Sequence, residues 1–492
     1  MVDQDHPEEY DVIVIGAGFS GIGMGIKLKE AGIDNFLILE SADSVGGTWR
    51  DNDYPGCACD IPSHLYSFSF EQSGDWSRMF PPQGEIWAYL QRCVQKYRLQ
   101  QHLRLSSNVD TAVFDAAELT WRITTADGRL FRGRALVSGM GGLSRPAYPD
   151  IRGLSRFAGT VFHSARWDHG FDLAGKTVAV IGTGASAIQF VPRIVDRVKT
   201  LLLFQRTPPW IVPKLDRPIG RWERWLYRNI PFARFLFRNF IYWRQEVRGI
   251  GFTIDRRLMG RATRIALRHL ARQVADEGLR NKLIPDYTIG CKRILISSDY
   301  YPALQKDNLD LITTGIREIT ADGIVDADGK EHEVDAIILG TGFQATDPIA
   351  PTRIFGIGGR ELSEDWQHGP EAFLGISVAG YPNLFLMVGP NTGLGHNSMI
   401  FMIESQIRYT IKMLQQMSRR GVRAVDVKAE IQSQYNRELQ KVLETSVWQS
   451  GCKSWYQTED GKNTSIWPGA SFSYWVKTLN PDSRHYDAAD RR

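Results

Sequence analysis

At about 150 residues per domain, a chain of 492 residues spans two to three domains, far more than a disulfide-stapled miniprotein. Its composition, 43% apolar and 23% charged, is that of a folded protein and excludes a wholly disordered chain. No apolar run approaches the roughly 20 residues of a membrane-spanning helix, and the acidic N-terminus lacks the features of a signal peptide. Five cysteines are too few for a disulfide framework, so the sequence predicts a reducing, cytoplasmic location.

The formal net charge of +4 is unevenly distributed. Residues 217–272 carry 14 arginines, no lysine and three acids, which is a local charge of +11, so the rest of the chain carries −7. Such a basic segment makes nucleic acid, an anionic membrane or a phosphorylated ligand candidate partners.

The first predicted elements form a strand–loop–helix–strand unit. Residues 10–15 (YDVIVI) are a short apolar run rich in β-branched residues, which indicates a buried strand. The glycine-rich sequence GAGFSG follows at residues 16–21, and a helical pattern then runs to Gly32. A second strand, FLILE, ends at Glu40. This order is typical of a unit that binds a dinucleotide.

The same unit occurs a second time further along the chain. Residues 177–181 (TVAVI) form a strand, GTGASA follows at 182–187, and after a helix the strand LLLFQ leads to Arg206. In both copies 24 positions separate the first glycine of the loop from the residue at the end of the second strand. One glycine-rich string arises by chance, but two with equal spacing indicate two dinucleotide-binding domains.

Both copies also close in the same way. Asp-Gly pairs at 127–128 and 328–329 are tight hairpin signals, and each is followed by a strand that ends in a glycine, Gly139 or Gly340. The interval from the turn glycine to the strand-end glycine is 11 residues in both copies. The sequence therefore predicts an α/β fold with two Rossmann-like dinucleotide-binding domains.

The residues at the two strand ends predict different ligands. In each loop one glycine allows the tight turn and one lets the backbone approach a pyrophosphate. The third, replaced by alanine at position 187, permits close packing of the helix on the strand. Glu40 is suited to accept hydrogen bonds from both hydroxyls of an unmodified ribose, as in FAD or NAD. Arg206 is a bidentate donor suited to the 2′-phosphate of NADPH, so the pair implies hydride transfer from NADPH to flavin.

One large insertion interrupts each copy, at 41–105 in the first and near 213–290 in the second. The segment after about residue 350 belongs to neither copy and is expected to complete the first domain. We therefore predict a FAD-binding domain made of 1–148 and 350–492, and a NADP-binding domain at 149–349 with a helical subdomain near 213–290.

The cysteines do not supply an electron acceptor. Disulfide reductases need a redox-active cysteine pair beside the flavin, and only Cys57 and Cys59 come close. A one-residue spacer makes a bridge between them geometrically unfavourable, so we interpret them as small packing residues. Molecular oxygen is then the predicted electron acceptor.

A motif between the two halves resembles that of a known family. The segment FAGTVFHSARWD, residues 157–168, closely resembles the Baeyer–Villiger monooxygenase signature FxGxxxHxxxW followed by Pro or Asp. Further matches over nearly the whole chain are GGTW at 46–49, YPG at 54–56, QRTP at 205–208, GCKR at 290–293, GTGF at 340–343 and GPN at 389–391. The N-hydroxylating and flavin-containing monooxygenases resemble the chain less.

The resemblance implies that NADPH, FAD and O2 are used to insert one oxygen atom next to a ketone carbonyl, through a flavin peroxide, giving an ester or lactone. Both the peroxide and its carbonyl adduct are anions, so this chemistry requires a fixed cation beside the flavin. Arg293 matches the family's catalytic arginine, and its guanidinium stays charged at any working pH. Asp60 matches the aspartate that pairs with the arginine and orients it. Lys292 matches a residue that helps Arg206 hold the 2′-phosphate, a solvated surface lysine being the alternative.

The predicted cofactor contacts come from the glycine-rich loops, the strand ends and the family motifs. For FAD they are Gly16, Gly18, Phe19, Ser20, Gly21, Glu40, Gly47, Thr48, Trp49, Asp60 and Asn391. For NADP they are Gly182, Thr183, Gly184, Ser186, Ala187, Arg206, Thr207, Lys292 and Arg293. No metal site is predicted.

Four positions of the family signature, Phe157, Gly159, His163 and Trp167, are expected to couple domain movement to catalysis. A four-residue spacing would put His163 and Trp167 on one helix face, whereas Gly159 and Asp168 favour a linker. For His163 we favour a buried histidine that orients a loop over an acid–base catalyst.

Two other positions have a purely structural alternative. Trp49 is expected where the chain passes close to the flavin, with core packing as the alternative. Asn391 and the backbone amides of 392–397 are expected at the pyrimidine edge of the flavin, with a simple helix N-terminus as the alternative. At 51–53, Asp-Asn-Asp replaces the aromatic and basic residues common in the family, a departure that concerns substrate contacts and not the fold.

The basic segment contains an amphipathic helix. Residues 231–248 begin with proline and place aromatic and aliphatic side chains at helical spacing, with arginines on the rest of the wheel. Such a helix can lie on an anionic membrane or act as a lid whose apolar face covers the substrate cleft. We favour the lid over membrane association, because the resembling family has a helical subdomain at this place. Nucleic acid is disfavoured because no recognised binding module accompanies the charge.

Three functional hypotheses follow. The leading one is a Baeyer–Villiger monooxygenase acting on a small-molecule ketone and O2, and the second is an N- or S-hydroxylating flavin monooxygenase acting on a heteroatom. The third is a non-catalytic flavin-binding protein, which the intact Arg293, Asp60 and both glycine-rich loops argue against. The identity of the ketone and the oligomeric state are not encoded in any recognisable motif.

Overall fold

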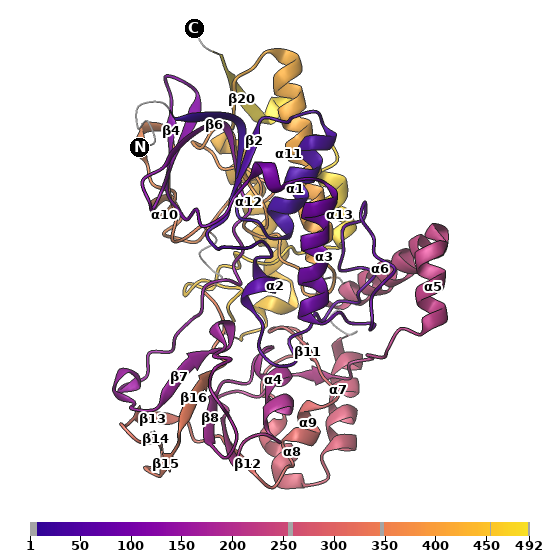
Figure 1. Ribbon diagram of the computed structural model, residues 1–492, viewed down its shortest axis with the longest axis vertical. Coiled ribbons are helices and arrows are strands. Elements are labelled where there is room, and N and C mark those ends of the chain that lie inside the picture. Colours follow the sequence, from indigo (N-terminus) through magenta and orange to yellow (C-terminus); the bar gives the residue numbers. More distant parts are fainter. Residues whose placement is uncertain (1–6, 254–258, 345–348, 453, 491–492) are drawn as a thin grey trace.

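The computed structural model describes residues 7–253, 259–344, 349–452 and 454–490. Part of the predicted helical subdomain, residues 254–258, lies outside the described residues. Figure 1 shows two α/β halves arranged end to end, with the helices α5 and α6 projecting from one side. Each half is built around a largely parallel sheet, which confirms the predicted fold class.

The first half contains an eight-stranded sheet. Its order is β17-β4-β5-β6-β1-β2-β3, and β18 pairs with the C-terminal part of β6. The central strand β1 lies parallel to both β2 and β6, whereas β4, β5 and β6 form an antiparallel meander. The strands are β1 (Glu8–Ile15), β2 (Phe36–Leu39), β3 (Leu103–Arg104), β4 (Val109–Asp115), β5 (Thr120–Thr125), β6 (Leu130–Ser138), β17 (Arg353–Phe355) and β18 (Leu384–Leu386).

Helix α1 packs between this sheet and two other helices, α3 and α11. Its apolar side chains are fully buried, among them Ile22, Met24 and Ile26. The remaining elements of this half are α1 (Phe19–Glu30), α2 (Thr48–Asp51), α3 (Gln83–Lys96), α10 (Leu362–Asp365), α11 (Met399–Arg420), α12 (Ala429–Glu444), α13 (Ser471–Lys477), β19 (Ala424–Val427) and β20 (Tyr486–Ala489).

The second half contains a five-stranded parallel sheet in the order β12-β9-β8-β16-β7. A three-stranded antiparallel sheet, β13-β14-β15, and the short pair β10-β11 accompany it. The elements are β7 (Thr160–His163), β8 (Thr177–Ile181), α4 (Ala187–Ile194), β9 (Thr200–Phe204), β10 (Ile211–Val212), β11 (Leu295–Ile296), α9 (Tyr300–Ala303), β12 (Leu309–Ile312), β13 (Ile316–Ile319), β14 (Gly323–Asp326), β15 (Glu331–Glu333) and β16 (Ala336–Leu339).

The two halves repeat one topology, as the matched spacings predict. In each half the second strand, β2 or β9, pairs in parallel with a strand further along the chain, β3 at the end of the first insertion or β12 after the second. The turn glycines of the two closing hairpins have φ values of +85° and +86°. The strand-end glycines occupy equivalent places, because the N–H of Gly139 donates to Ile15 O and that of Gly340 donates to Ile181 O.

The two chain crossings between the halves lie side by side. Segment 145–148 pairs with segment 341–344, since the N–H of Ala147 donates to Gly342 O over 2.9 Å and that of Gln344 donates to Arg145 O over 3.0 Å. We call this pair the two-stranded connection. After it the chain returns to the first sheet through β17 and β18.

The insertion of the second half is helical, with α5 (Arg221–Asn229), α6 (Pro231–Thr253), α7 (Met259–Gln273) and α8 (Glu277–Leu283). The prediction that the apolar face of α6 covers a cleft as a lid is wrong. That face points to solvent, with Phe232 67% exposed and Phe240 61% exposed. The physical reason is that α6 packs inward through a different face. On that face Ile241 is buried in the core, and Arg238, Tyr242 and Glu246 are buried and hydrogen-bonded.

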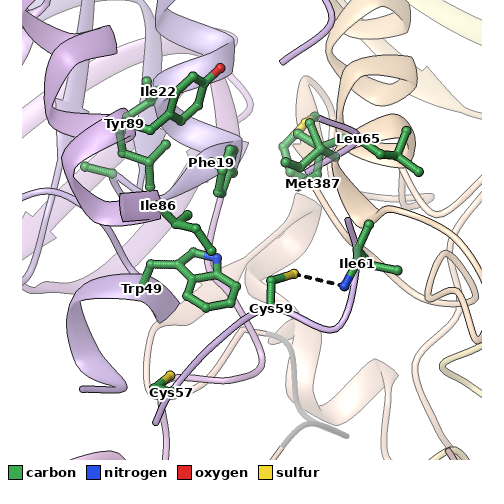
Figure 2. Packing of buried hydrophobic residues seen from close by; sticks show 14 of the residues in the cluster. Phe19, Ile22, Trp49, Cys57, Cys59, Ile61, Leu65, Ile86, Tyr89 and Met387 are labelled. Carbon is green, nitrogen blue, oxygen red and sulfur yellow. Dashed lines mark hydrogen bonds between the residues drawn. The ribbon is translucent and has the colours of Figure 1, made fainter. Parts of the chain in front are cut away.

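The cysteines divide into one disulfide and three buried thiols. Cys291 and Cys452 form a disulfide with their Cα atoms 6.2 Å apart. The sequence did not predict this bond, because the two residues are 161 positions apart and no local spacing pairs them. Cys57, Cys59 and Cys93 are free and buried. Figure 2 shows Cys57 and Cys59 within the apolar packing, and burial raises the pKa of the Cys57 thiol to about 12, as expected for packing residues.

Across the described ranges, no helix combines the length and the apolar composition that a membrane span requires.

Candidate active site

An ion pair joins the two halves of the protein. Arg293 lies in the loop between α8 and β11, and Asp60 lies in the insertion of the first half. The Nε of Arg293 donates to Asp60 Oδ2 over 3.0 Å, and Nη2 donates to the same oxygen. Both side chains are about one-third exposed, and Asp60 raises the pKa of Arg293. The carboxylate therefore fixes one edge of a permanently charged guanidinium, whose Nη1 has no acceptor within the described residues.

A buried tyrosine, Tyr456, and a half-buried one, Tyr66, flank this ion pair. Tyr456 interacts electrostatically with both Arg293 and Asp60, and burial raises its pKa to about 12. Tyr66 accepts a hydrogen bond over 3.1 Å from Nε1 of Trp49, and burial raises its pKa well above the usual value. Both tyrosines are therefore neutral phenols at working pH. No motif marks either of them in the sequence, so they were missed.

The disulfide ties together the loops that carry two of these residues. Cys291 lies two positions before Arg293, and Cys452 lies four positions before Tyr456. The bond therefore holds the predicted catalytic arginine against the C-terminal loop of the first half. These loops meet only in the folded chain, so no local sequence pattern predicts their contact.

The first glycine-rich loop has the geometry of a phosphate-binding turn. A Cβ on Gly21 would lie 1.8 Å from Gly16 O, so only glycine allows α1 to approach β1 this closely. The N–H of Gly46 donates to Ala17 O over 2.9 Å, which places the GGTW segment against the loop. No side chain caps the N-terminus of α1 at Gly18, and its first turn holds no acid. This helix end therefore offers free N–H donors to an anion.

The strand-end carboxylate of Glu40 is buried beside this loop, with 4% exposure. Its Oε2 accepts a hydrogen bond from Ala17 N over 2.7 Å, and its Oε1 accepts from Arg50 Nη1 over 3.0 Å. Arg50 also forms an ion pair with Asp51 over 2.6 Å. Asp51 is the first of the three residues after GGTW that depart from the family pattern, and Arg50 is its partner. A buried carboxylate, an uncapped helix and a glycine turn together fit the ribose and pyrophosphate of FAD.

The second glycine-rich loop repeats this geometry. A Cβ on Gly182, which has φ +109°, would lie 2.5 Å from Gly340 O. Thr183 Oγ1 donates to Thr207 O over 3.2 Å, and no side chain caps the N-terminus of α4 at Ser186. Gly184 lies in the turn, and Ala187 is the first residue of α4.

Two cations lie near one another at the end of β9. Burial and the neighbouring charge of Arg206 lower the pKa of Lys292. Among the described residues, neither side chain forms an ion pair with an acid. Asp286 interacts electrostatically with Lys292 without forming an ion pair, so the two like charges are only partly compensated. Such an arrangement favours an anionic ligand and fits the 2′-phosphate of NADP.

His163 lies at the end of an edge strand, so the linker interpretation of the family signature is nearer the structure than the shared helix face. Its Nδ1 accepts a hydrogen bond from Ala165 N over 3.0 Å, and its ring lies 5.7 Å from that of Tyr148 and 5.9 Å from that of Phe343. Both aromatic neighbours belong to the two-stranded connection. The residue is fully buried and burial lowers its pKa to about 4, so the imidazole is neutral at working pH.

The other signature residues brace the same edge of the second sheet. The Trp167 ring lies 5.1 Å from Phe162 and 5.4 Å from Phe190, which belongs to α4. A Cβ on Gly159 would lie 2.5 Å from Asp335 O and 2.6 Å from the ring of Phe157. These contacts attach the signature segment to the parallel sheet.

Asn391 is buried with φ +56° and braces the loop before α11. Its Nδ2 donates to Asn463 O over 2.8 Å and to Ile466 O over 3.3 Å, so both amide hydrogens are used within the protein. The side-chain amide of Asn391 therefore has no hydrogen left to donate to the flavin, and the backbone amides of 392–397 remain the predicted contact. Of the other predicted FAD contacts, Phe19, Ser20 and Trp49 are buried, and Thr48 begins α2 directly after Gly47.

Two glycine-rich dinucleotide units on separate parallel sheets, with a fixed cation between the halves, define an oxidoreductase that uses two dinucleotides. A family model described as pyridine nucleotide-disulphide oxidoreductase matches residues 13–218. A Baeyer–Villiger monooxygenase of Pseudomonas aeruginosa is 53% identical over 96% of this chain and 90% of its own length. Two solved structures, a steroid monooxygenase bound to NADP and an OTEMO complex with FAD and NADP, match with TM-scores of 0.87 and 0.88. They are 28% and 25% identical, and each match covers 98% of this chain and at least 99% of theirs.

The chain belongs to the Baeyer–Villiger monooxygenase family.

Proposed function

We propose that this protein is an NADPH- and FAD-dependent Baeyer–Villiger monooxygenase that converts a ketone into an ester or lactone. The reaction consumes ketone, O2, NADPH and a proton, and it releases the ester, NADP and water. The observation that carries the proposal is the Arg293–Asp60 pair between two dinucleotide units, in a chain whose relatives are monooxygenases of this family.

The first half, made of 1–148 and 350–492, is the proposed FAD-binding domain. The uncapped N-terminus of α1 would hold the pyrophosphate, and Glu40 would accept hydrogen bonds from the ribose. When bound, FAD supplies the two-electron chemistry that activates O2 for oxygen insertion. The similar OTEMO structure contains both FAD and NADP, which supports this pair of cofactors.

The second half, 149–349, is the proposed NADP-binding domain. The N-terminus of α4 would hold the pyrophosphate, while Arg206 and Lys292 would hold the 2′-phosphate. The mutual repulsion of the two cations is relieved when a dianionic phosphate lies between them, which favours NADPH over NADH.

Arg293 is the proposed catalytic residue. Its guanidinium keeps a positive charge with one edge held by Asp60 and the other edge free, so it stabilises negative charge that develops on the substrate's carbonyl oxygen. Asp60 is a positioning residue, because it acts through the arginine by fixing the plane of the guanidinium. The side chains of Arg293 and Asp60 are each about one-third exposed, so a small molecule can reach the free edge of the guanidinium.

His163 is a second proposed positioning residue. Its neutral ring packs against both segments of the two-stranded connection, which is the described chain linkage between the halves. Movement of one half relative to the other must bend this connection, so the imidazole couples the signature segment to that movement.

Incubation of the purified holoenzyme with NADPH, labelled O2 and a panel of linear, cyclic and aryl ketones tests the proposal. We expect an ester or lactone that carries one labelled oxygen, with NADPH consumed in equal amount. Oxygenation of added sulfides or amines without any ketone product would replace the proposal by the heteroatom-hydroxylating alternative. A flavin-containing protein that oxygenates neither would exclude both monooxygenase functions.

A further inference from the structure

One face of α6 is apolar and points to solvent. Phe232, Leu236, Phe240, Trp243 and Val247 follow one another at intervals of four, four, three and four residues, so they form one stripe along the helix. We call these five residues the α6 stripe. Their exposed fractions run from 51% for Leu236 to 67% for Phe232. Contiguous exposed apolar surface of this kind marks an interaction site on a folded protein.

The opposite face of α6 fixes this orientation. Arg238 is buried and its Nη1 donates to His64 O over 2.8 Å. Glu246 is buried too, and its Oε1 accepts from Ser471 Oγ over 2.6 Å and from Asn397 Nδ2 over 2.5 Å. Turning the helix to bury the α6 stripe would break these bonds and leave charged groups without their partners. The stripe therefore stays outside while the polar face is anchored.

Further exposed aromatic side chains lie close to the α6 stripe. The ring of Trp243 lies 5.9 Å from that of Phe472 on α13, and Phe472 and Val476 of that helix are 43% and 47% exposed. On the neighbouring helix α5, the rings of Trp222 and Trp225 stack 4.7 Å apart and are also exposed. Figure 1 shows α5 and α6 projecting together from the body of the protein, where a flat partner can reach them.

Arginines border this apolar surface. The Arg244 guanidinium lies 6.0 Å from the Phe240 ring centroid, and Arg248 follows one helical turn later. Arg221 and Arg224 lie on α5. Within the part of the chain that the structure describes, none of these four arginines forms an ion pair with an acid. The surface thus combines exposed aromatic groups with uncompensated positive charge.

We propose that the α5–α6 pair is a docking surface for anionic lipid bilayers. In this arrangement α6 lies in the plane of the interface, with the α6 stripe among the acyl chains and Arg244 and Arg248 at the phosphate groups. Aromatic and aliphatic residues on one side with arginines at the border are the composition that such interfacial helices use.

Charge selects the bilayer over a second copy of this chain. The four arginines that border the apolar surface, Arg221, Arg224, Arg244 and Arg248, form no ion pair within the described residues. Two copies meeting through this surface would bring these arginines of one copy close to those of the other, and the like charges would repel. An anionic bilayer supplies both the opposite charge and an apolar layer.

Flotation of the holoenzyme with lipid vesicles tests the proposal. We expect the protein to float with vesicles of phosphatidylcholine and phosphatidylglycerol at low salt, and roughly tenfold less with phosphatidylcholine alone. Added salt should weaken the binding, because it screens the arginine–phosphate attraction. Equal flotation with both kinds of vesicle would contradict the anionic preference.

Two variants separate the apolar and the electrostatic contributions. The triple substitution Phe232→Ser, Leu236→Ser and Phe240→Ser should lower partitioning more than about tenfold. The pair Arg244→Glu and Arg248→Glu should lower it by a comparable amount, since each arginine contributes a factor of about five near an anionic surface.

A matched control comes from exposed apolar residues elsewhere. Ile357→Ser with Val442→Ser removes side chains that are 44% and 50% exposed, and it should leave flotation unchanged. All variants should keep the wild-type circular dichroism spectrum and the wild-type rate of NADPH oxidation without vesicles.

The proposal is overturned if the wild-type protein does not float, or if the stripe variant floats as well as wild type. It is also overturned if sedimentation velocity shows a vesicle-independent oligomer that the stripe variant converts to monomer, since a second copy would then cover this surface.

Discussion

Replacing Arg206 by alanine tests how the second dinucleotide unit recognises its ligand. Arg206 is exposed at the end of β9, and Lys292 lies close enough for the arginine to lower its pKa. We expect Arg206→Ala to raise the KM for NADPH far more than that for NADH, because only NADPH carries a 2′-phosphate.

The structure sets the size of this effect. A hydrogen bond to a charged group contributes about 1.5–3 kcal/mol, which corresponds to a factor of roughly 10 to 150. Because Arg206 is exposed and solvent screens it, we expect the lower part of this range, about 10 to 30-fold. Removing Arg206 also relieves Lys292 of a like charge, so the lysine keeps part of the phosphate binding and a double variant should lose more.

Steady-state NADPH and NADH oxidation, with saturating ketone and O2, measures the ratio of the two KM values. Arg197→Ala, at another exposed arginine of the same half, serves as the matched control and should leave the ratio unchanged. An equal rise of KM for both nucleotides in Arg206→Ala would refute phosphate recognition by this residue.

Glycine packing, a buried histidine and the disulfide give three further tests. Gly21→Ala places a Cβ 1.8 Å from a backbone oxygen, so we expect loss of bound flavin and about 1–3 kcal/mol of stability, whereas Gly84→Ala, with open space around it, should retain both. The pKa of His163 is about 4 in the folded protein and 6.5 ordinarily. The neutral imidazole therefore contributes stability that is fully present above pH 6.5 and is lost as the pH falls toward 4. The free energy of unfolding should change by roughly 3 kcal/mol over this range, and His163→Gln should remove that pH dependence in chemical unfolding. Cys452→Ser should lower the thermal unfolding midpoint by the equivalent of about 2–4 kcal/mol and abolish any effect of reductant on it, and an unchanged midpoint would contradict a structural disulfide.

The repeated fold was predictable because its signals are local. Strand, glycine turn and helix follow one another within about 30 residues in a dinucleotide-binding unit. The equal spacing of two such units excludes coincidence. A Cβ on Gly16 would lie 2.9 Å from Gly139 O and one on Gly182 would lie 2.5 Å from Gly340 O, which shows why the first position of both loops is glycine.

The direction of α6 was not predictable from its own sequence. Helical periodicity identifies an apolar stripe but does not say whether that stripe faces the protein or the solvent. The orientation is set by Arg238 and Glu246, whose partners at His64 and Asn397 lie more than 150 positions away in the sequence.

The surroundings of the ion pair depend on contacts of the same long-range kind. Arg293 and Asp60 were found through motif resemblance, whereas Tyr456 and the Cys291–Cys452 bond have no local signature. The partner of Glu40 was missed although it lies only ten positions away in the sequence. Arg50 directly follows the GGTW motif, and a single positive charge near a strand-end carboxylate carries little information until the fold brings the two together.

Comparison of Arg293→Ala with Arg293→Lys and wild type measures what the guanidinium contributes to oxygen insertion. We expect flavin content and anaerobic bleaching of the flavin by NADPH to stay close to wild type, while ester formation falls by about 10²–10³-fold in the alanine variant. The lysine variant should recover part of the rate, since it restores a charge without the planar fork. Ester formation at the wild-type rate in Arg293→Ala, with flavin reduction intact, would contradict the role of the guanidinium and with it the proposed site.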